Sequence, residues 1–99
     1  MNKIISYLGF AQKSNNCIMG QTAIKKTTKQ LNLILVCDTA SENLKNLAKN
    51  MANKHNCELI ISKIDLSQLI KFADIKIIGI TDENLSKAII DNKEKISIG

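Results

Sequence analysis

The chain has 99 residues, of which 44% are hydrophobic and 3% aromatic, and its formal net charge is +5. This length predicts one domain over residues 1–99 with an aliphatic core, and no apolar run approaches the roughly 20 residues of a membrane span or forms a signal peptide. These features exclude a membrane-spanning protein and predict a cytoplasmic one.

The first part of the chain alternates helical and extended patterns. Residues 3–13 carry apolar side chains at helical spacing, so we predict a helix that ends at the polar turn 14–16. A short apolar piece, 17–19, follows and ends at Gly20. We predict a second helix over 21–30 with its lysines on the outer and flanking faces. The side chains expected to face inward are Ala23, Ile24, Thr27 and Leu31.

The central part contains the most regular pattern of the sequence. Residues 33–37 (LILVC) form a continuous apolar run of strand length, which is typical of a strand buried on both faces. Ser41 is a good N-cap for a helix over 42–55, whose apolar residues form one stripe and whose lysines and asparagines lie opposite. Residues 58–62 (ELIIS) are predicted to form the next strand.

The last part repeats the alternation of helix and strand. Asp65 with Gln68 resembles a capping box at the start of a short helix, and residues 75–80 (IKIIGI) predict another strand. Thr81 or Asp82 then caps a last helix. Strands separated by helices of this length are expected to pair mainly in parallel through right-handed crossovers. The pattern therefore predicts an α/β protein, a three-layer α/β/α sandwich.

Few side chains suit catalysis or metal binding. Cys17, Cys37 and Cys57 lack CxxC spacing and lie in or beside apolar stretches, which favours buried structural thiols over disulfides or a zinc site. The single histidine, His55, ends the most regular helix, where a surface or helix-dipole role is favoured. We therefore expect no enzymatic activity, no cofactor and no metal.

Two aspartates and a glycine occupy positions that functional sites often use. Asp38 and Asp82 each follow a predicted strand, where α/β enzymes place carboxylates. Each also precedes a helix, so helix-end electrostatics is the simpler interpretation. Gly9 lies inside a helical stripe and not after a strand, so it is not part of a phosphate loop. We expect it to permit close helix packing.

The positive charge comes entirely from lysine, because the 14 basic residues include no arginine. Lysine is a compact, hydrated charge that suits the backbone of a polyanion, whereas two-pronged reading of guanine is usually done by arginine. A lysine-rich composition also keeps a small protein in solution. Charge alone therefore favours nucleic-acid binding and simple solubility equally.

Several short stretches follow one another in a characteristic order. They are LGFAQK at 8–13, Gly20 with Lys26, LILVCDTASEN at 33–43, and Thr81-Asp82 followed by KAI at 87–89. In this order and spacing the chain resembles the kink-turn-binding ribosomal-protein family, and within it the bacterial YlxQ-like branch. The resemblance implies an α/β/α sandwich with a four-stranded mixed sheet, and an RNA-binding function of ribosomal-protein type within a ribonucleoprotein.

The resemblance also implies a binding surface. In the family, a glycine matching Gly20 begins a helix whose first residues face the RNA, a lysine matches Lys26, and the loop at 71–74 forms a second contact. Free amides at a helix N-terminus attract phosphate. The expected RNA-binding residues are Gly20, Gln21, Thr22, Lys25, Lys26, Lys29, Lys71 and Phe72. The expected partners are structured RNA, ribosomal RNA included, and ribosomal or translation proteins, with the protein itself a monomer.

Two alternatives stay open. Kink-turn binders typically have an Asn-Glu pair that reads sheared G·A pairs, but this chain has Thr22 and Ala23, and Ala23 offers no carboxylate to a guanine edge. The alternative function is a protein-interaction or scaffold module on the same fold that has lost kink-turn recognition. Phe72 either stacks on a splayed base or plugs the core at the end of the short helix, and we favour the core plug.

Overall fold

The computed structural model describes residues 3–70 and 75–96. Its elements in chain order are α1 (Lys3–Lys13), β1 (Cys17–Met19), α2 (Gln21–Lys26), β2 (Leu33–Cys37), α3 (Glu42–His55), β3 (Glu58–Ser62), α4 (Leu66–Ile70), β4 (Ile77–Ile80), α5 (Glu83–Asp91) and a 3₁₀ turn η1 (Lys93–Lys95). The predicted bounds of α1, β2, α3 and β3 are confirmed, and the short apolar piece at 17–19 forms the strand β1. The predicted strand 75–80 begins two residues later, as β4. No helix in the described part is long and apolar enough to cross a membrane.

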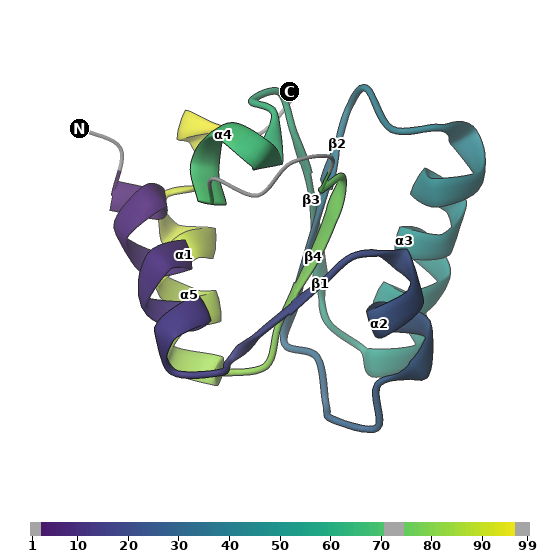
Figure 1. Cartoon of the computed structure of the whole chain (residues 1–99), viewed down its shortest axis with the longest axis horizontal. Helices are drawn as coiled ribbons and strands as arrows, with labels where there is room; N and C mark the ends of the chain where they lie inside the picture. The colour runs from purple at the N-terminus through teal and green to yellow at the C-terminus, as the bar shows by residue number, and fades with distance from the viewer. Residues whose placement is uncertain (1–2, 71–74, 97–99) are drawn as a thin grey trace.

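The four strands form one mixed sheet in the order β1-β4-β2-β3. Only β2 and β3 pair in parallel, while β4 pairs antiparallel with both β1 and β2. Figure 1 shows α1, α4 and α5 on one side of the sheet and α2 and α3 on the other. The mixed sheet flanked by helices is therefore confirmed, but the expectation of mainly parallel pairing is wrong.

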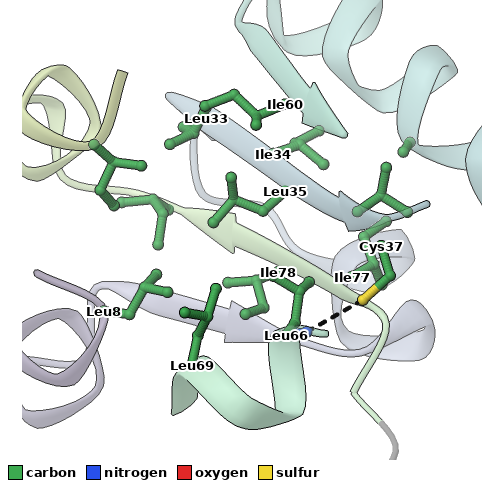
Figure 2. Packing of buried hydrophobic residues seen from close by; sticks show 14 of the residues in the cluster. Leu8, Leu33, Ile34, Leu35, Cys37, Ile60, Leu66, Leu69, Ile77 and Ile78 are labelled. Atoms are coloured by element: carbon green, nitrogen blue, oxygen red, sulfur yellow. Dashed lines mark hydrogen bonds between the residues drawn. The ribbon is translucent and has the colours of Figure 1, made fainter. Parts of the chain in front are cut away.

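The antiparallel direction of β4 follows from where α4 lies. The thiol of Cys37, at the end of β2, accepts a hydrogen bond from the Leu66 backbone N–H at 3.3 Å (Figure 2). The Cys37 backbone N–H donates to the Lys76 carbonyl at 2.9 Å, just before β4 begins. The chain thus re-enters the sheet at the same end where β3 leaves it, so β4 runs back along β2. A crossover to the opposite end would have been needed for parallel pairing.

The core lies on both faces of the two central strands. Every residue of β2 and β4 is buried. Figure 2 shows Leu8 of α1 with Leu66 and Leu69 of α4 pointing toward the sheet. The aliphatic core predicted from composition is confirmed, because the buried side chains of the described part are almost all Ile, Leu, Val, Ala and Met.

The predicted caps at Ser41 and Asp82 are confirmed. The Ser41 hydroxyl accepts from the Leu44 N–H at 3.2 Å, and the Asp82 carboxylate accepts from the Leu85 N–H at 2.9 Å. Asp65 likewise accepts from the Ser67 N–H, at 3.0 Å. These bonds satisfy amide donors that a helix leaves unpaired in its first turn.

The second helix is shorter than the predicted 21–30. It ends at Lys26, because the Thr27 backbone is extended and its hydroxyl accepts the Lys29 N–H at 3.1 Å. A threonine hydroxyl that bonds a nearby amide offers the backbone an alternative to the helix. Ala23, expected inward, is exposed, while Ile24 and Leu31 are buried as expected.

Gly9 does not serve close helix packing. A Cβ atom placed on Gly9 would have no neighbouring atom within 4 Å. Gly79, in β4, is the glycine at a close approach, because a Cβ there would lie 2.9 Å from the Leu31 side chain. Leu31 therefore packs directly over the centre of the sheet.

Candidate nucleic-acid interface

The expected binding surface begins at Gly20. Its backbone has φ 93° and ψ 157°, and no side chain caps α2 at this point. The Gly20 N–H donates to the Ile77 carbonyl at 3.0 Å, and its own carbonyl accepts from the Ile24 N–H at 3.1 Å. The first bond holds the start of α2 against β4 and the second begins the helix, whose N-terminus has no side-chain cap.

The side chains of α2 divide into one anchor and an exposed set. Ile24 is fully buried and attaches the helix to the sheet. The exposed residues of the expected site are Gln21, Thr22, Lys25, Lys26 and Lys29. The structure therefore brings the predicted residues from Gly20 to Lys29 into one continuous surface segment. Lys71 and Phe72 lie outside the described residues.

The three lysines of this segment lack acidic neighbours. The ion pairs of the described part join Lys76 to Asp65, Lys87 to Glu83 and Lys93 to Glu58, with N–O distances of 3.6, 3.5 and 3.2 Å. Within residues 3–70 and 75–96, none of Lys25, Lys26 and Lys29 has a carboxylate at ion-pairing distance. Their charges are available to an external anion.

A contact that the sequence did not indicate holds the loop after α2. The Leu31 N–H donates to His55 Nδ1 at 3.1 Å, and Gln30 Nε2 donates to the His55 carbonyl at 2.6 Å. We call this pair of bonds the His55 clip. His55 is half-buried at the last position of α3, where the sequence placed it, and its ring also accepts a hydrogen bond from the loop. The sequence contained no sign of this contact, because Leu31 lies 24 residues from His55 and contributes only its backbone N–H.

A polar cluster lies at the carboxyl end of β2. The Asp65 carboxylate accepts from the Ser67 N–H and hydroxyl and lies 3.6 Å from Lys76, which also donates to Thr39 at 3.4 Å. The Ser67 hydrogen bonds, with a smaller effect of Lys76, lower the pKa of Asp65. Each group here has a partner within the fold, so the cluster is structural. Asp82 acts as the predicted helix cap.

The cysteines are unpaired thiols whose ionisation is suppressed. Burial raises the pKa of Cys17 to about 11 and, as the main cause, raises the pKa of Cys37 and Cys57 as well. Cys37 is buried as predicted, whereas Cys17 and Cys57 are only half-buried. A thiol with a raised pKa is a poor nucleophile and metal ligand at neutral pH. Among the described residues, no group of His, Cys, Asp and Glu is placed to hold a metal ion.

The outer face of α3 carries further lysines, on the side that the sequence predicted to lie opposite the apolar stripe. Lys49 and Lys54 are exposed and Lys45 is half-buried, and none has an ion-pair partner in the described part of the chain. The sequence itself indicated this positive face, because α3 contains no acidic residue after Glu42. Only the structure places this helix on the same side of the sheet as α2 (Figure 1).

Comparison with known proteins adds information on the fold. No protein-family model matches the chain, and no curated protein matches it either. Among solved structures, the chain is similar to a protein of unknown function from Bacillus halodurans. The TM-score is 0.79 with 17% sequence identity, and the match covers 95% of this chain and 99% of that one. At this identity the likeness shows a shared fold alone.

Proposed function

We propose that this protein is a non-enzymatic RNA-binding protein that holds structured RNA through Gly20, α2 and the loop that follows. The observation that carries the proposal is the group of exposed lysines, Lys25, Lys26 and Lys29, which have no carboxylate neighbour among the described residues. A lysine without an internal partner retains its full attraction for phosphate and releases a counterion when it binds. The resemblance to kink-turn binders supports the same surface.

The binding mode follows from the groups present. The ammonium groups of Lys25 and Lys26 contact phosphate oxygens, while Gln21 and Thr22 offer hydrogen bonds to sugar or base edges at the helix start. Gly20 lacks a side chain, which allows an RNA backbone to approach. Lys71 and Phe72 are proposed to add a second contact, in line with the family resemblance. The proposed targets are bent or kink-turn-like RNAs, with ribosomal RNA among them.

The test of this function is the charge reversal Lys26→Glu. Binding of a kink-turn RNA, measured by fluorescence anisotropy at several KCl concentrations, should weaken at least tenfold, and the slope of log affinity against log salt should become shallower. The exposed position predicts an unchanged circular dichroism spectrum. Undiminished affinity in a folded Lys26→Glu variant would remove α2 from the binding surface. Sequencing of RNA recovered with the wild-type protein would identify the natural target.

A protein-interaction or scaffold role is the second candidate, and one surface feature favours it. Phe10 is 62% exposed and Ile5 37% exposed, both on α1. These are the exposed large apolar side chains of the described part, and they lie on the side of the sheet opposite α2. Apolar side chains on a helix surface are typical of protein contacts. The absence of the family's Asn-Glu pair at Thr22 and Ala23 points the same way.

Restoring the family pair separates the two functions. In the double variant Thr22→Asn/Ala23→Glu, the new side chains should hydrogen bond to tandem G·A pairs, each adding about 1–3 kcal/mol of discrimination. Competition between a kink-turn RNA and a G·A-disrupted control measures this gain. A wild-type protein that binds neither RNA, together with a Phe10→Ala variant that loses a protein partner, would support the scaffold role.

A further inference from the structure

The positive charge of the chain is concentrated in one segment. Residues 21–56, which contain α2, β2 and α3, carry six lysines and two carboxylates, a net charge of +4. The remaining residues carry eight lysines and seven carboxylates, a net charge of +1. The chain's overall +5 is thus almost entirely a property of this segment, and solubility alone would not require such an uneven distribution.

The pairing of the lysines is uneven in the same way. All three ion pairs of the described part involve lysines outside residues 21–56. The six lysines inside the segment have no carboxylate within ion-pairing distance among the described residues. They are Lys25, Lys26, Lys29, Lys45, Lys49 and Lys54.

After Glu42 in its first turn, the outer face of α3 carries only positive charge. Lys45 and Lys49 are four residues apart and so lie one turn, about 6 Å, from each other on the same face. Like charges at this spacing slightly destabilise a helix. The exposed residues that follow Lys45 in α3, apart from Lys49 and Lys54, are asparagines at positions 46, 50 and 53. Ammonium and amide donors are the groups that contact phosphate and sugar oxygens in nucleic-acid complexes.

The His55 clip joins this face to the proposed α2 surface. Gln30 and Leu31 are bonded to His55, the last residue of α3, at 2.6 and 3.1 Å. Lys29 directly precedes the clipped loop residues, and Lys54 directly precedes His55. The clip therefore holds Lys29, the last lysine of the α2 surface, near Lys54, the last lysine of α3. Figure 1 shows both helices on the same side of the sheet.

The side of the sheet covered by α2 and α3 suits an RNA backbone better than a protein partner or the apolar part of a lipid bilayer. The exposed large apolar side chains of the described part, Ile5 and Phe10, lie on α1, across the sheet. The side of the sheet covered by α2 and α3 therefore offers charge and amides without apolar anchors. Protein interfaces depend on buried apolar and aromatic anchors, whereas RNA backbone binding depends on lysines.

We propose that the outer face of α3, through Lys45, Lys49 and Lys54, is a second phosphate-binding strip that holds a duplex arm of the RNA bound by α2. This inference rests on the proposed RNA-binding function. A helix of 14 residues is about 21 Å long, so it spans several phosphates of a duplex strand. The strip recognises the backbone and carries no base specificity.

Two double variants with the same net charge test the strip. Lys45→Gln/Lys49→Gln removes two charges from α3, and Lys13→Gln/Lys87→Gln removes two from exposed positions on α1 and α5. The probes are a minimal kink-turn RNA and the same RNA with one long duplex arm, measured by anisotropy against KCl. The α3 variant should bind the long RNA several-fold more weakly and flatten its log–log salt slope by about 1–2 units. It should bind the minimal RNA normally, and the α1/α5 variant should bind both RNAs normally.

The remaining outcomes are distinguishable. Equal losses in both double variants would show a general charge effect and overturn the strip, as would no loss in either. If Lys26→Glu weakens binding while the α3 variant binds the long RNA normally, the strip is wrong and the proposed function stands. If the wild-type protein binds neither RNA, both the α3 strip and the proposed RNA-binding function are wrong. Binding to phosphatidylserine vesicles that depends on Lys45 and Lys49, without RNA binding, would assign the face to a membrane surface instead.

Discussion

At the scale of single residues, His55 joins the end of α3 to the loop after α2. Its Nδ1 accepts the Leu31 N–H at 3.1 Å. In His55→Ala the Leu31 N–H, next to a fully buried side chain, loses its partner, and unfolding should become easier by about 1–3 kcal/mol. His55→Asn, whose Oδ1 replaces Nδ1 as acceptor, should restore most of this stability. Urea melts of the two variants make the comparison. Equal destabilisation by Ala and Asn would contradict the hydrogen-bond explanation.

Gly20 and Gly9 form a matched pair of residue-scale tests. Gly20 has φ 93° and ψ 157°, a conformation essentially confined to glycine, although a Cβ there would meet no atom within 4 Å. Gly20→Ala should therefore cost about 1–3 kcal/mol through backbone strain alone. Gly9 lies inside α1 with open space around it, so Gly9→Ala should stabilise the protein by about 0.5–1 kcal/mol. Thermal melts that show the same sign for both variants would refute this account.

At the scale of elements, the short helix α4 depends on the ionised carboxylate of Asp65. Hydrogen bonds from Ser67 and the charge of Lys76 lower its pKa below the ordinary 3.8. A carboxyl whose pKa is lowered in the folded state stabilises the protein at pH values above its ordinary pKa. This contribution is lost as the pH falls through the lowered pKa. The difference in urea midpoint between wild type and Asp65→Asn should thus shrink as the pH is lowered from neutral to about 3. A difference that stays constant with pH would show that the charge of Asp65 is irrelevant.

At the scale of the whole molecule, the concentration of charge in residues 21–56 should steer encounters with RNA. A one-sided positive field raises the association rate with a polyanion, and salt screens it. In stopped-flow measurements at low salt, Lys45→Gln/Lys49→Gln should associate with RNA several-fold more slowly than Lys13→Gln/Lys87→Gln. The two rates should converge at about 1 M salt, where the screening length is about 3 Å. Rates that differ equally at all salt concentrations would exclude steering.

Local sequence patterns predicted the elements well, and the reason is physical. The apolar stripes of α1 and α3 and the apolar run of β2 are periodic within a few residues, and the caps Ser41 and Asp82 act on amides three residues away. The early end of α2 was missed, because the Thr27 hydroxyl competes with the helix for the backbone. Of the predicted site, Gly20 to Lys29 form one surface, while Lys71 and Phe72 lie outside the described residues.

By itself, the sequence determined the five helices and the three longer strands, the aliphatic core and the excess of lysine, since composition and short-range periodicity are sufficient for each. Only the tertiary structure decided the direction of β4, which α4 imposes by returning the chain to the same end of the sheet. Only the tertiary structure brought Leu31 to His55 and left six lysines without carboxylate neighbours in the described part. These contacts join residues far apart in the chain, and a local pattern contains no information on which distant residues will meet.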